Sequence, residues 1–152
     1  MRYLKLMIFL LLLCLPSAAF CQNLQKAGAT DVGILYVDID SVQSVSRGGQ
    51  LYLAVFAEEK YTDADYLKSL REEESLAQAA SAMYLYLFNQ KGTEYTVAAR
   101  YILDTSGRVC ADLGADVQLQ QVAGNETMFN AYTKALDGLN AKSRQSKWLQ
   151  KK

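Results

Sequence analysis

The stretch Val32 to Asp40 (VGILYVDID), followed by Gln50 to Glu58 (QLYLAVFAE), decides the fold of this 152-residue chain. Both runs are rich in β-branched, aliphatic and aromatic residues, which favour the extended, partly buried backbone of a strand. The segment between them offers a turn at Ser41 to Val45 and the pair Gly48-Gly49, and glycine readily adopts the positive φ of a chain reversal. The two runs therefore predict an antiparallel β-hairpin.

Further strand patterns follow this hairpin. Met83 to Phe88 (MYLYLF) fits either a continued helix or a short strand. We favour the strand, because alternation places Tyr84, Tyr86 and Phe88 on one face and because Asn89 to Gly92 is a good turn. Asp104 to Gly107 reads as a tight reversal. Three more strands are expected at Tyr95 to Leu103, Arg108 to Leu113 and Val117 to Val122.

Two segments carry helix patterns. Thr62 to Asp65 resembles a capping box and precedes strong helix formers, which predicts a helix from Asp63 to Ala80. The acidic run Glu72 to Glu74 is expected on the surface of that helix, partly paired with Lys68 and Arg71. A second helix is expected to start at an Asn125 cap. Its buried stripe is predicted to consist of Phe129, Tyr132, Leu136 and Leu139.

The order of these elements predicts an α+β fold. Consecutive hairpins give an antiparallel β-sheet, and one or two helices are expected to pack on one of its faces. No linker or repeat interrupts the chain, so a single domain is expected over residues 22–141. Residues 142–152 hold five Lys and Arg with no acidic residue and are expected to form a basic, flexible tail whose deletion leaves the fold intact.

The amino terminus has the pattern of a secretory signal peptide over residues 1–21. Arg2 and Lys5 are positive, Leu6 to Leu15 is apolar, and small residues precede the expected cleavage before Gln22. Lipid attachment at Cys21 is the alternative, but bulky Phe20 disfavours it. The chain is therefore expected to be exported to the periplasm, the cell surface or the extracellular space.

Composition excludes several kinds of site. The chain has no histidine, which excludes Ser-His-Asp and Cys-His nucleophilic sites and His-ligated zinc. Residues 22–152 hold 14 Lys and Arg against 16 Asp and Glu, a net charge of −2 that argues against nucleic-acid binding. Peripheral membrane contact through the basic tail is a less favoured alternative to a solvated end. No cofactor and no metal site are expected.

Other candidate residues favour structural roles. Cys110 on a predicted strand is expected to be a small buried residue, because no histidine is present to activate its thiol. Asp38 and Asp40 alternate onto one strand face, where calcium binding or acid–base chemistry competes with simple solvation. Solvation is the favoured interpretation, since no calcium-loop spacing surrounds them.

Aromatic residues are the best candidates for a binding surface. Tyrosine provides large contact area with a polar tip, and it is enriched where proteins recognise partners. The candidates for partner binding are Tyr84, Tyr86, Tyr95, Tyr101 and Trp148. Packing of the four tyrosines over the sheet is the favoured structural interpretation.

Two segments resemble the surface-adhesin protein E family of secreted bacterial proteins: Tyr36 to Val42 followed by Gly48-Gly49 and an apolar strand, and Arg100 to Val109. The resemblance implies a small antiparallel-sheet binding protein that is exposed on the envelope. The partner that we expect is another envelope or extracellular protein. The chain departs from the family pattern by lacking a second cysteine after the leader, and no binding residue is transferred.

Two functions therefore remain. The first is an exported, non-enzymatic binding or envelope-associated protein. The second is a small secreted enzyme that uses carboxylate and tyrosine chemistry in a cleft of the sheet. Two or more carboxylates converging with a tyrosine in one concave pocket would favour the enzyme, whereas a flat aromatic face would favour binding.

Overall fold

A computed structural model of the chain describes residues 23–149. The predicted leader, with the alternative lipid site Cys21, lies outside the described residues. The side chain of Trp148 is also outside them. These predictions therefore stay predictions.

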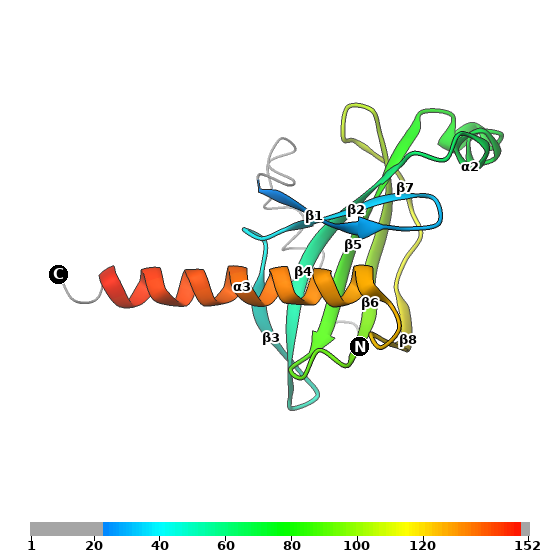
Figure 1. Cartoon of the computed structure of the whole chain (residues 1–152). Helices are drawn as coiled ribbons and strands as arrows, with labels where there is room; N and C mark the ends of the chain where they lie inside the picture. The colour runs from blue at the N-terminus through cyan, green and yellow to red at the C-terminus, as the bar shows by residue number, and fades with distance from the viewer. Residues whose placement is uncertain (1–22, 150–152) are drawn as a thin grey trace.

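Eight strands form one antiparallel sheet (Figure 1). The order across the sheet is β1-β2-β4-β5-β6-β7, with β3 beside β4 and β8 beside β6. The strands are β1 (Leu24–Ala29), β2 (Gly33–Asp38), β3 (Gln43–Arg47), β4 (Gln50–Tyr61), β5 (Ala79–Asn89), β6 (Glu94–Asp104), β7 (Val109–Asp112) and β8 (Asp116–Gln121). Together with two α-helices, this sheet confirms the expected α+β class.

The hairpin prediction is correct in its pairing but incomplete. β2 pairs antiparallel with the second half of β4, and Val37 lies opposite Ala57. The unpredicted strand β3 pairs with the first half of β4 and overlaps the expected turn at Ser41 to Val45. Gly48 and Gly49 form the β3–β4 reversal with φ of 58° and 77°. Backbone pairing with a long neighbouring strand overrides the weak strand propensity of the polar sequence QSVSR.

Strand β1 was also missed. Its sequence LQKAGA has no β-branched or aromatic residue, so local propensity does not mark it. It forms because its backbone pairs with β2, where Gln25 lies opposite Val37. The predicted strand at Met83 to Phe88 is confirmed as part of β5.

The predicted helix from Asp63 to Ala80 is wrong beyond its second turn. The helix α2 covers Ala64–Leu70, a short 3₁₀ turn η1 covers Glu74–Leu76, and β5 begins at Ala79. Asp63 is the N-cap, and its carboxylate accepts a hydrogen bond from the Tyr66 amide at 2.7 Å. Because the helix ends early, Glu72 to Glu74 do not extend its surface.

Arg71 fixes this early end. Its Nε and Nη2 atoms donate hydrogen bonds of 2.9 and 2.7 Å to the Ala79 carbonyl, which folds the chain back at the start of β5. Leu76 is buried in the same turn, against Ala79 and Ile102. The start of β5 therefore consists of Ala79 and Ala80, which have a high helix propensity and were predicted to be helical.

The long helix α3 (Glu126–Leu149) crosses one face of the sheet, and its carboxyl-terminal part projects past the sheet (Figure 1). Asn125 caps it as predicted, because its side-chain oxygen accepts the Met128 amide at 3.0 Å. The helix continues without interruption beyond Ala141 through Leu149. The flexibility of residues 142–152 stays a prediction.

The predicted buried stripe of α3 is wrong by about one residue. Phe129 is 58% exposed and Leu136 is exposed as well, whereas the fully buried positions include Met128, Ala131 and Ala135. Tyr132 and Leu139 are only partly buried. Small residues let the helix approach the sheet closely. At Gly138, for example, a Cβ atom would lie 2.9 Å from the Ile39 carbonyl oxygen.

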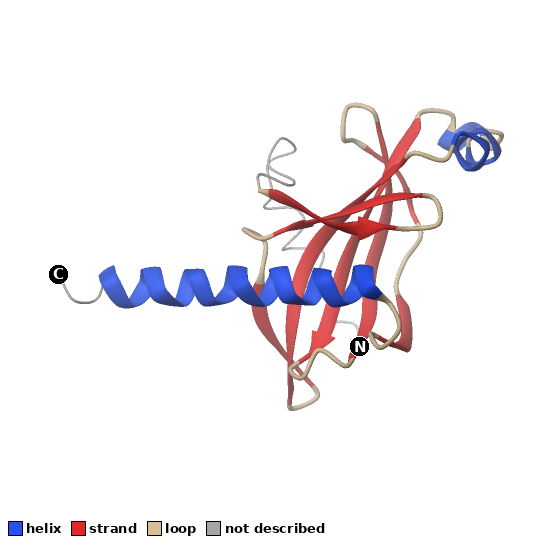
Figure 2. Cartoon of the chain, viewed as in Figure 1, coloured by secondary structure: helices blue, strands red, loops and turns tan. Residues whose placement is uncertain are grey.

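The main core lies between α3 and the sheet. It is built from the face of β4 that carries Leu53, Val55 and Ala57 and the face of β5 that carries Tyr86 and Phe88. The segment from α2 to η1 covers the end of this same face, through contacts with Tyr61, Ala79, Ala82 and Ile102. Figure 2 shows α3 across the sheet and α2 near the end of the strands. The residues that the two helices contact lie on one face of the sheet, which confirms the predicted packing.

Candidate functional site

A hollow opens on the helix-covered face, beside the start of α3. Its volume is about 380 Å³, within the range of small-ligand pockets. We call it the tyrosine hollow and define it by the side chains that determine its chemistry: Glu59, Tyr84, Tyr86, Tyr95, Arg100, Asp116 and Gln120. These residues come from β4, β5, β6 and β8. The β1–β2 turn and the first turn of α3 complete its walls.

A β-bulge places two of the lining residues. The β5–β6 register runs from Leu85 opposite Ala99 to Tyr86 opposite Val97, so Ala98 is an extra residue in β6. Without this insertion, Val97 and Arg100 would point to opposite faces, because side chains alternate along a strand. With it, both line the tyrosine hollow.

Glu59 is the buried carboxylate of the hollow, with 7% of its surface exposed. Its Oε2 accepts a 2.7 Å hydrogen bond from the Tyr84 hydroxyl, and its Oε1 accepts a very short one from the Thr30 hydroxyl. The Gly33 amide in turn donates to Thr30 Oγ1 at 3.0 Å. The β1–β2 turn is therefore fixed to β4 and β5 through this carboxylate.

A second hydrogen-bond chain forms the opposite wall. The Tyr95 hydroxyl donates to Gln120 Oε1 at 2.6 Å, and Gln120 Nε2 donates to Asp116 Oδ2 at 3.4 Å. Asp116 also accepts the Gln118 amide at 3.1 Å. These bonds orient β8 against β6, although β8 itself is largely exposed.

Tyr86 presents the free hydroxyl of the hollow. The residue is 7% exposed, and its ring stacks on Tyr84 at 5.4 Å and meets the edge of Tyr95 at 5.8 Å. Its hydroxyl has no hydrogen-bond partner within residues 23–149 and is not a fully enclosed polar atom there, so it opens into the hollow. A hydroxyl that opens into a hollow and has no partner among the described residues is available to a ligand.

Burial and nearby carboxylates keep these tyrosines neutral. Burial is the main cause of the raised pKa of Tyr84 and Tyr86, and the negative charge of Glu59 adds to it. Burial also raises the pKa of Tyr95, with Asp116 as the second cause. Arg100 lowers the pKa of Tyr86 but does not outweigh burial, Glu59 and Tyr95, which all raise it. The hydroxyls are therefore hydrogen-bonding groups at neutral pH, not bases.

The start of α3 forms the remaining wall. Thr127 donates to the Ala29 carbonyl at 2.7 Å, and Met128 contributes an apolar side chain beside Leu35. A Cβ atom on Gly28 would come within 2.4 Å of Thr127 Oγ1, so glycine permits this close contact between β1 and α3.

The structure brings three of the predicted binding residues together. Tyr84, Tyr86 and Tyr95 line one concave site and do not form a flat aromatic face. Tyr101 lies opposite Met83 on the other face of the sheet, away from the hollow. Whether these residues bind a partner stays a prediction.

Two structural expectations from the sequence are wrong in detail. Cys110 is partly exposed and not fully buried, because it lies on the short edge strand β7. Asp38 is buried and does not form a solvated face with Asp40. Asp38 ends β2, and its carboxylate accepts the Asp40 amide at 3.0 Å within a turn.

The residues that give the hollow its charge were missed. Glu59 did carry a signal, because it falls one residue past the predicted strand on the same alternating face as Val55 and Ala57. A charge in an apolar alternation marks a position that needs a buried partner. Arg100 and Asp116 carried no such signal, since their placement depends on register shifts.

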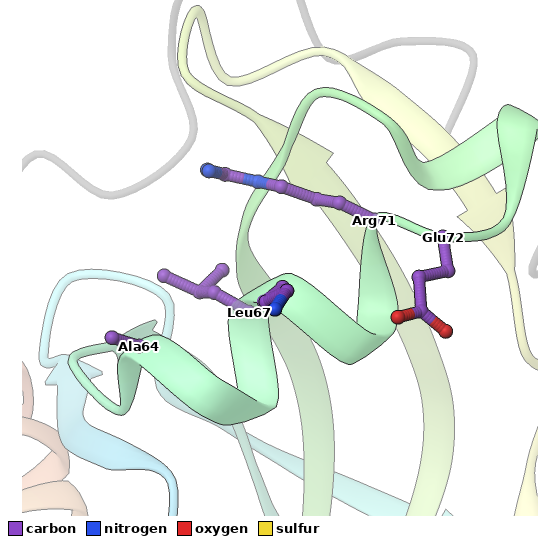
Figure 3. Close-up of a pocket in the computed structure, with 5 residues that line it drawn as sticks. Ala64, Leu67, Arg71 and Glu72 are labelled. Atoms are coloured by element: carbon purple, nitrogen blue, oxygen red, sulfur yellow. The ribbon is translucent and has the colours of Figure 1, made fainter.

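A second depression lies on α2 and carries no comparable arrangement (Figure 3). All five residues that line it come from this one helix or the two positions after it, and it is largely open to solvent. Arg71 there is engaged with the Ala79 carbonyl.

Two features are absent from residues 23–149. No group of three or more Cys, Asp or Glu side chains is placed to hold a metal ion. Across the same residues, no helix combines the length and apolar character needed to cross a membrane.

The fold and the hollow define an α+β protein with a helix-covered antiparallel sheet and a tyrosine-lined pocket. Comparison of the chain with protein-family models, curated proteins and solved structures finds no match.

Proposed function

We propose that this chain is an exported, non-enzymatic binding protein that takes a small ligand, or a side chain of a larger partner, into the tyrosine hollow. The observation that carries the proposal is the unpaired Tyr86 hydroxyl, which opens into a cavity of about 380 Å³ from a side chain that is otherwise buried. Apolar rings with a few convergent polar groups are typical of ligand pockets.

Export and an extracellular partner belong to the same proposal. They are supported by the amino-terminal sequence pattern and by the resemblance to secreted envelope proteins. A concave site suits a projecting group of a partner better than a flat protein surface. A partner protein would therefore insert a side chain into the hollow.

The enzyme alternative has one observation in its favour. Glu59, Asp116 and three tyrosines converge on one concave pocket, which is the arrangement expected of carboxylate and tyrosine chemistry. Binding is nevertheless favoured, because Glu59 already accepts hydrogen bonds from two hydroxyl groups and the tyrosines are held neutral. Turnover of chromogenic esters or glycosides that disappears in Glu59→Gln would establish the enzyme instead.

The test is a thermal-shift screen of small molecules on the purified protein and two variants. Gln120→Trp places a large ring in the hollow, whereas Gln121→Trp puts the same ring on the neighbouring residue, which alternates to the other face. Ligands are expected to stabilise the unmodified protein and Gln121→Trp but not Gln120→Trp. Equal stabilisation of all three proteins would reject the hollow as the site.

A further inference from the structure

Within residues 23–149, the buried carboxylate of Glu59 in the tyrosine hollow forms no ion pair. The ion pairs within residues 23–149 are Lys60–Glu58 and Arg108–Asp104, and neither includes Glu59. Two hydroxyl groups donate to Glu59, but they carry no charge. Buried carboxylates are normally paired with a cation, because desolvation of an isolated charge is costly.

Glu59 also has unused capacity to accept hydrogen bonds. A carboxylate offers about four lone-pair sites, and described residues fill one on each oxygen. Further donors can therefore approach Glu59 from the hollow. The Tyr86 hydroxyl provides one more acceptor on the same side.

The surroundings favour a positive ligand group. Asp31 and Asp116 add two carboxylates to the walls of the hollow, against the single cation Arg100. Tyrosine rings attract cations through their electron-rich faces. Tyr84 and Tyr86, which stack on each other, supply such rings beside Glu59.

From this arrangement we propose that the tyrosine hollow binds a protonated amine, with Glu59 as its counter-ion and Tyr84 and Tyr86 as aromatic walls. The inference rests on the proposed binding function and names the chemical class of the ligand. The amine can belong to a free organic molecule or to a lysine side chain of a partner protein. The two sources share the same ammonium chemistry.

Arg100 has a defined role in this proposal. It lies opposite Tyr84 in the β5–β6 register, and it makes no ion pair with a described residue. Its positive charge repels an entering ammonium group. Removal of this charge by Arg100→Gln is therefore expected to tighten binding several-fold.

The experiment measures binding to the purified protein by calorimetry with probes that differ in charge. Butylammonium and tetramethylammonium are compared with neutral butanol and anionic butyrate, and Nα-acetyl-lysine amide represents a partner's side chain. The cations are expected to bind at least about tenfold more tightly than butanol and butyrate, and less tightly as salt increases. Tighter binding of acetyl-lysine amide than of butylammonium identifies a partner's lysine as the source, and the reverse order identifies a free amine.

Two carboxylate variants locate the charge. Glu59→Gln is expected to weaken cation binding at least about tenfold. Glu58→Gln removes the same charge from the neighbouring residue, which points to the other face and pairs with Lys60, and it is expected to leave binding unchanged. The probe series on the unmodified protein keeps the proposal testable if Glu59→Gln fails to fold.

The outcomes separate this inference from the proposed function. Tighter binding of butyrate or butanol than of the cations would overturn the amine proposal and leave a binding hollow in place. Equal weakening by Glu58→Gln and Glu59→Gln would also overturn it. No binding of any probe, combined with no hit in the thermal-shift screen, would overturn both.

Discussion

The ammonium group of Lys142 donates a hydrogen bond to the backbone carbonyl of Val42 at 3.0 Å, across 100 residues of sequence. The same ammonium donates to the Asp40 carbonyl. Both carbonyls lie in the connection between β2 and β3. Lys142 therefore ties the far part of α3 to a loop of the sheet, although the charge pattern assigns it to a free basic tail.

We predict that Lys142→Ala lowers the free energy of unfolding by about 1–3 kcal/mol, because charged hydrogen bonds to two carbonyls are lost. Arg144→Ala is the matched control, since Arg144 is exposed and its side chain makes, within residues 23–149, a single 3.4 Å hydrogen bond to the Asn140 carbonyl of its own helix. Urea denaturation of the three proteins measures the effect. If Arg144→Ala lowers the free energy of unfolding as much as Lys142→Ala does, the effect comes from loss of a positive charge on the helix and not from the contact of Lys142 with the loop.

We predict that Tyr84→Phe destabilises the protein by about 1–3 kcal/mol, because Glu59 then keeps one hydrogen-bond donor among the described residues, the Thr30 hydroxyl. Tyr101→Phe removes a hydroxyl from the other face of the sheet and is expected to change stability by less than about 0.5 kcal/mol. The measurement compares the denaturation midpoints of these two variants with that of the unmodified protein. If Tyr84→Phe is neutral, the Glu59–Tyr84 bond contributes nothing to the fold.

Alkaline pH is expected to unfold the protein with release of buried tyrosine protons. The pKa values of Tyr84 and Tyr86 are raised in the folded chain above the ordinary value of 10.0, chiefly by burial. Their stabilising contribution is complete below pH 10 and falls as pH rises further, by about 1.4 kcal/mol per pH unit for each tyrosine. Phenolate absorbance and circular dichroism followed together should change in one step. Full ionisation of all tyrosines near pH 10 in the folded protein would contradict this prediction.

The placement of α3 predicts that truncation of two adjacent residues lowers the stability of the protein by very different amounts. Met128→Ala should cost about 2–5 kcal/mol, because Met128 is buried in the main core. Phe129→Ala should cost less than about 1 kcal/mol, because 58% of Phe129 is exposed. Thermal unfolding distinguishes them. A larger loss of stability for Phe129→Ala than for Met128→Ala would support the buried stripe that the sequence pattern predicts.

Cys110→Ala is expected to cost at most about 1–2 kcal/mol, because the thiol is only partly buried against the smaller core cluster. Ligand binding in the tyrosine hollow should be unaffected, since Cys110 lies outside it. The same calorimetric titration checks this. Loss of binding in a folded Cys110→Ala protein would assign the thiol a functional role.

Local sequence alone determined the strands whose alternation is strong and the turns that need special residues. MYLYLF places Tyr84, Tyr86 and Phe88 on one face whatever surrounds them, because side chains alternate along a strand. Gly48-Gly49 and the Asn125 cap act through their own backbone and side chain, so they too were predictable. The α+β class followed from the order of these elements.

Only the tertiary structure decided where the helices stop, which strands form at the edges and what the site contains. Arg71 donates hydrogen bonds to the Ala79 carbonyl, and the helix-prone segment between these residues forms turns and η1 before β5 begins at Ala79. The extra residue Ala98 carries Arg100 to the same face as Val97. Partners distant in sequence stabilise features such as the Ala98 bulge, the pairing of β1 with β2 and the hydrogen bond from Lys142 to Val42. For that physical reason no local pattern of residues specifies them.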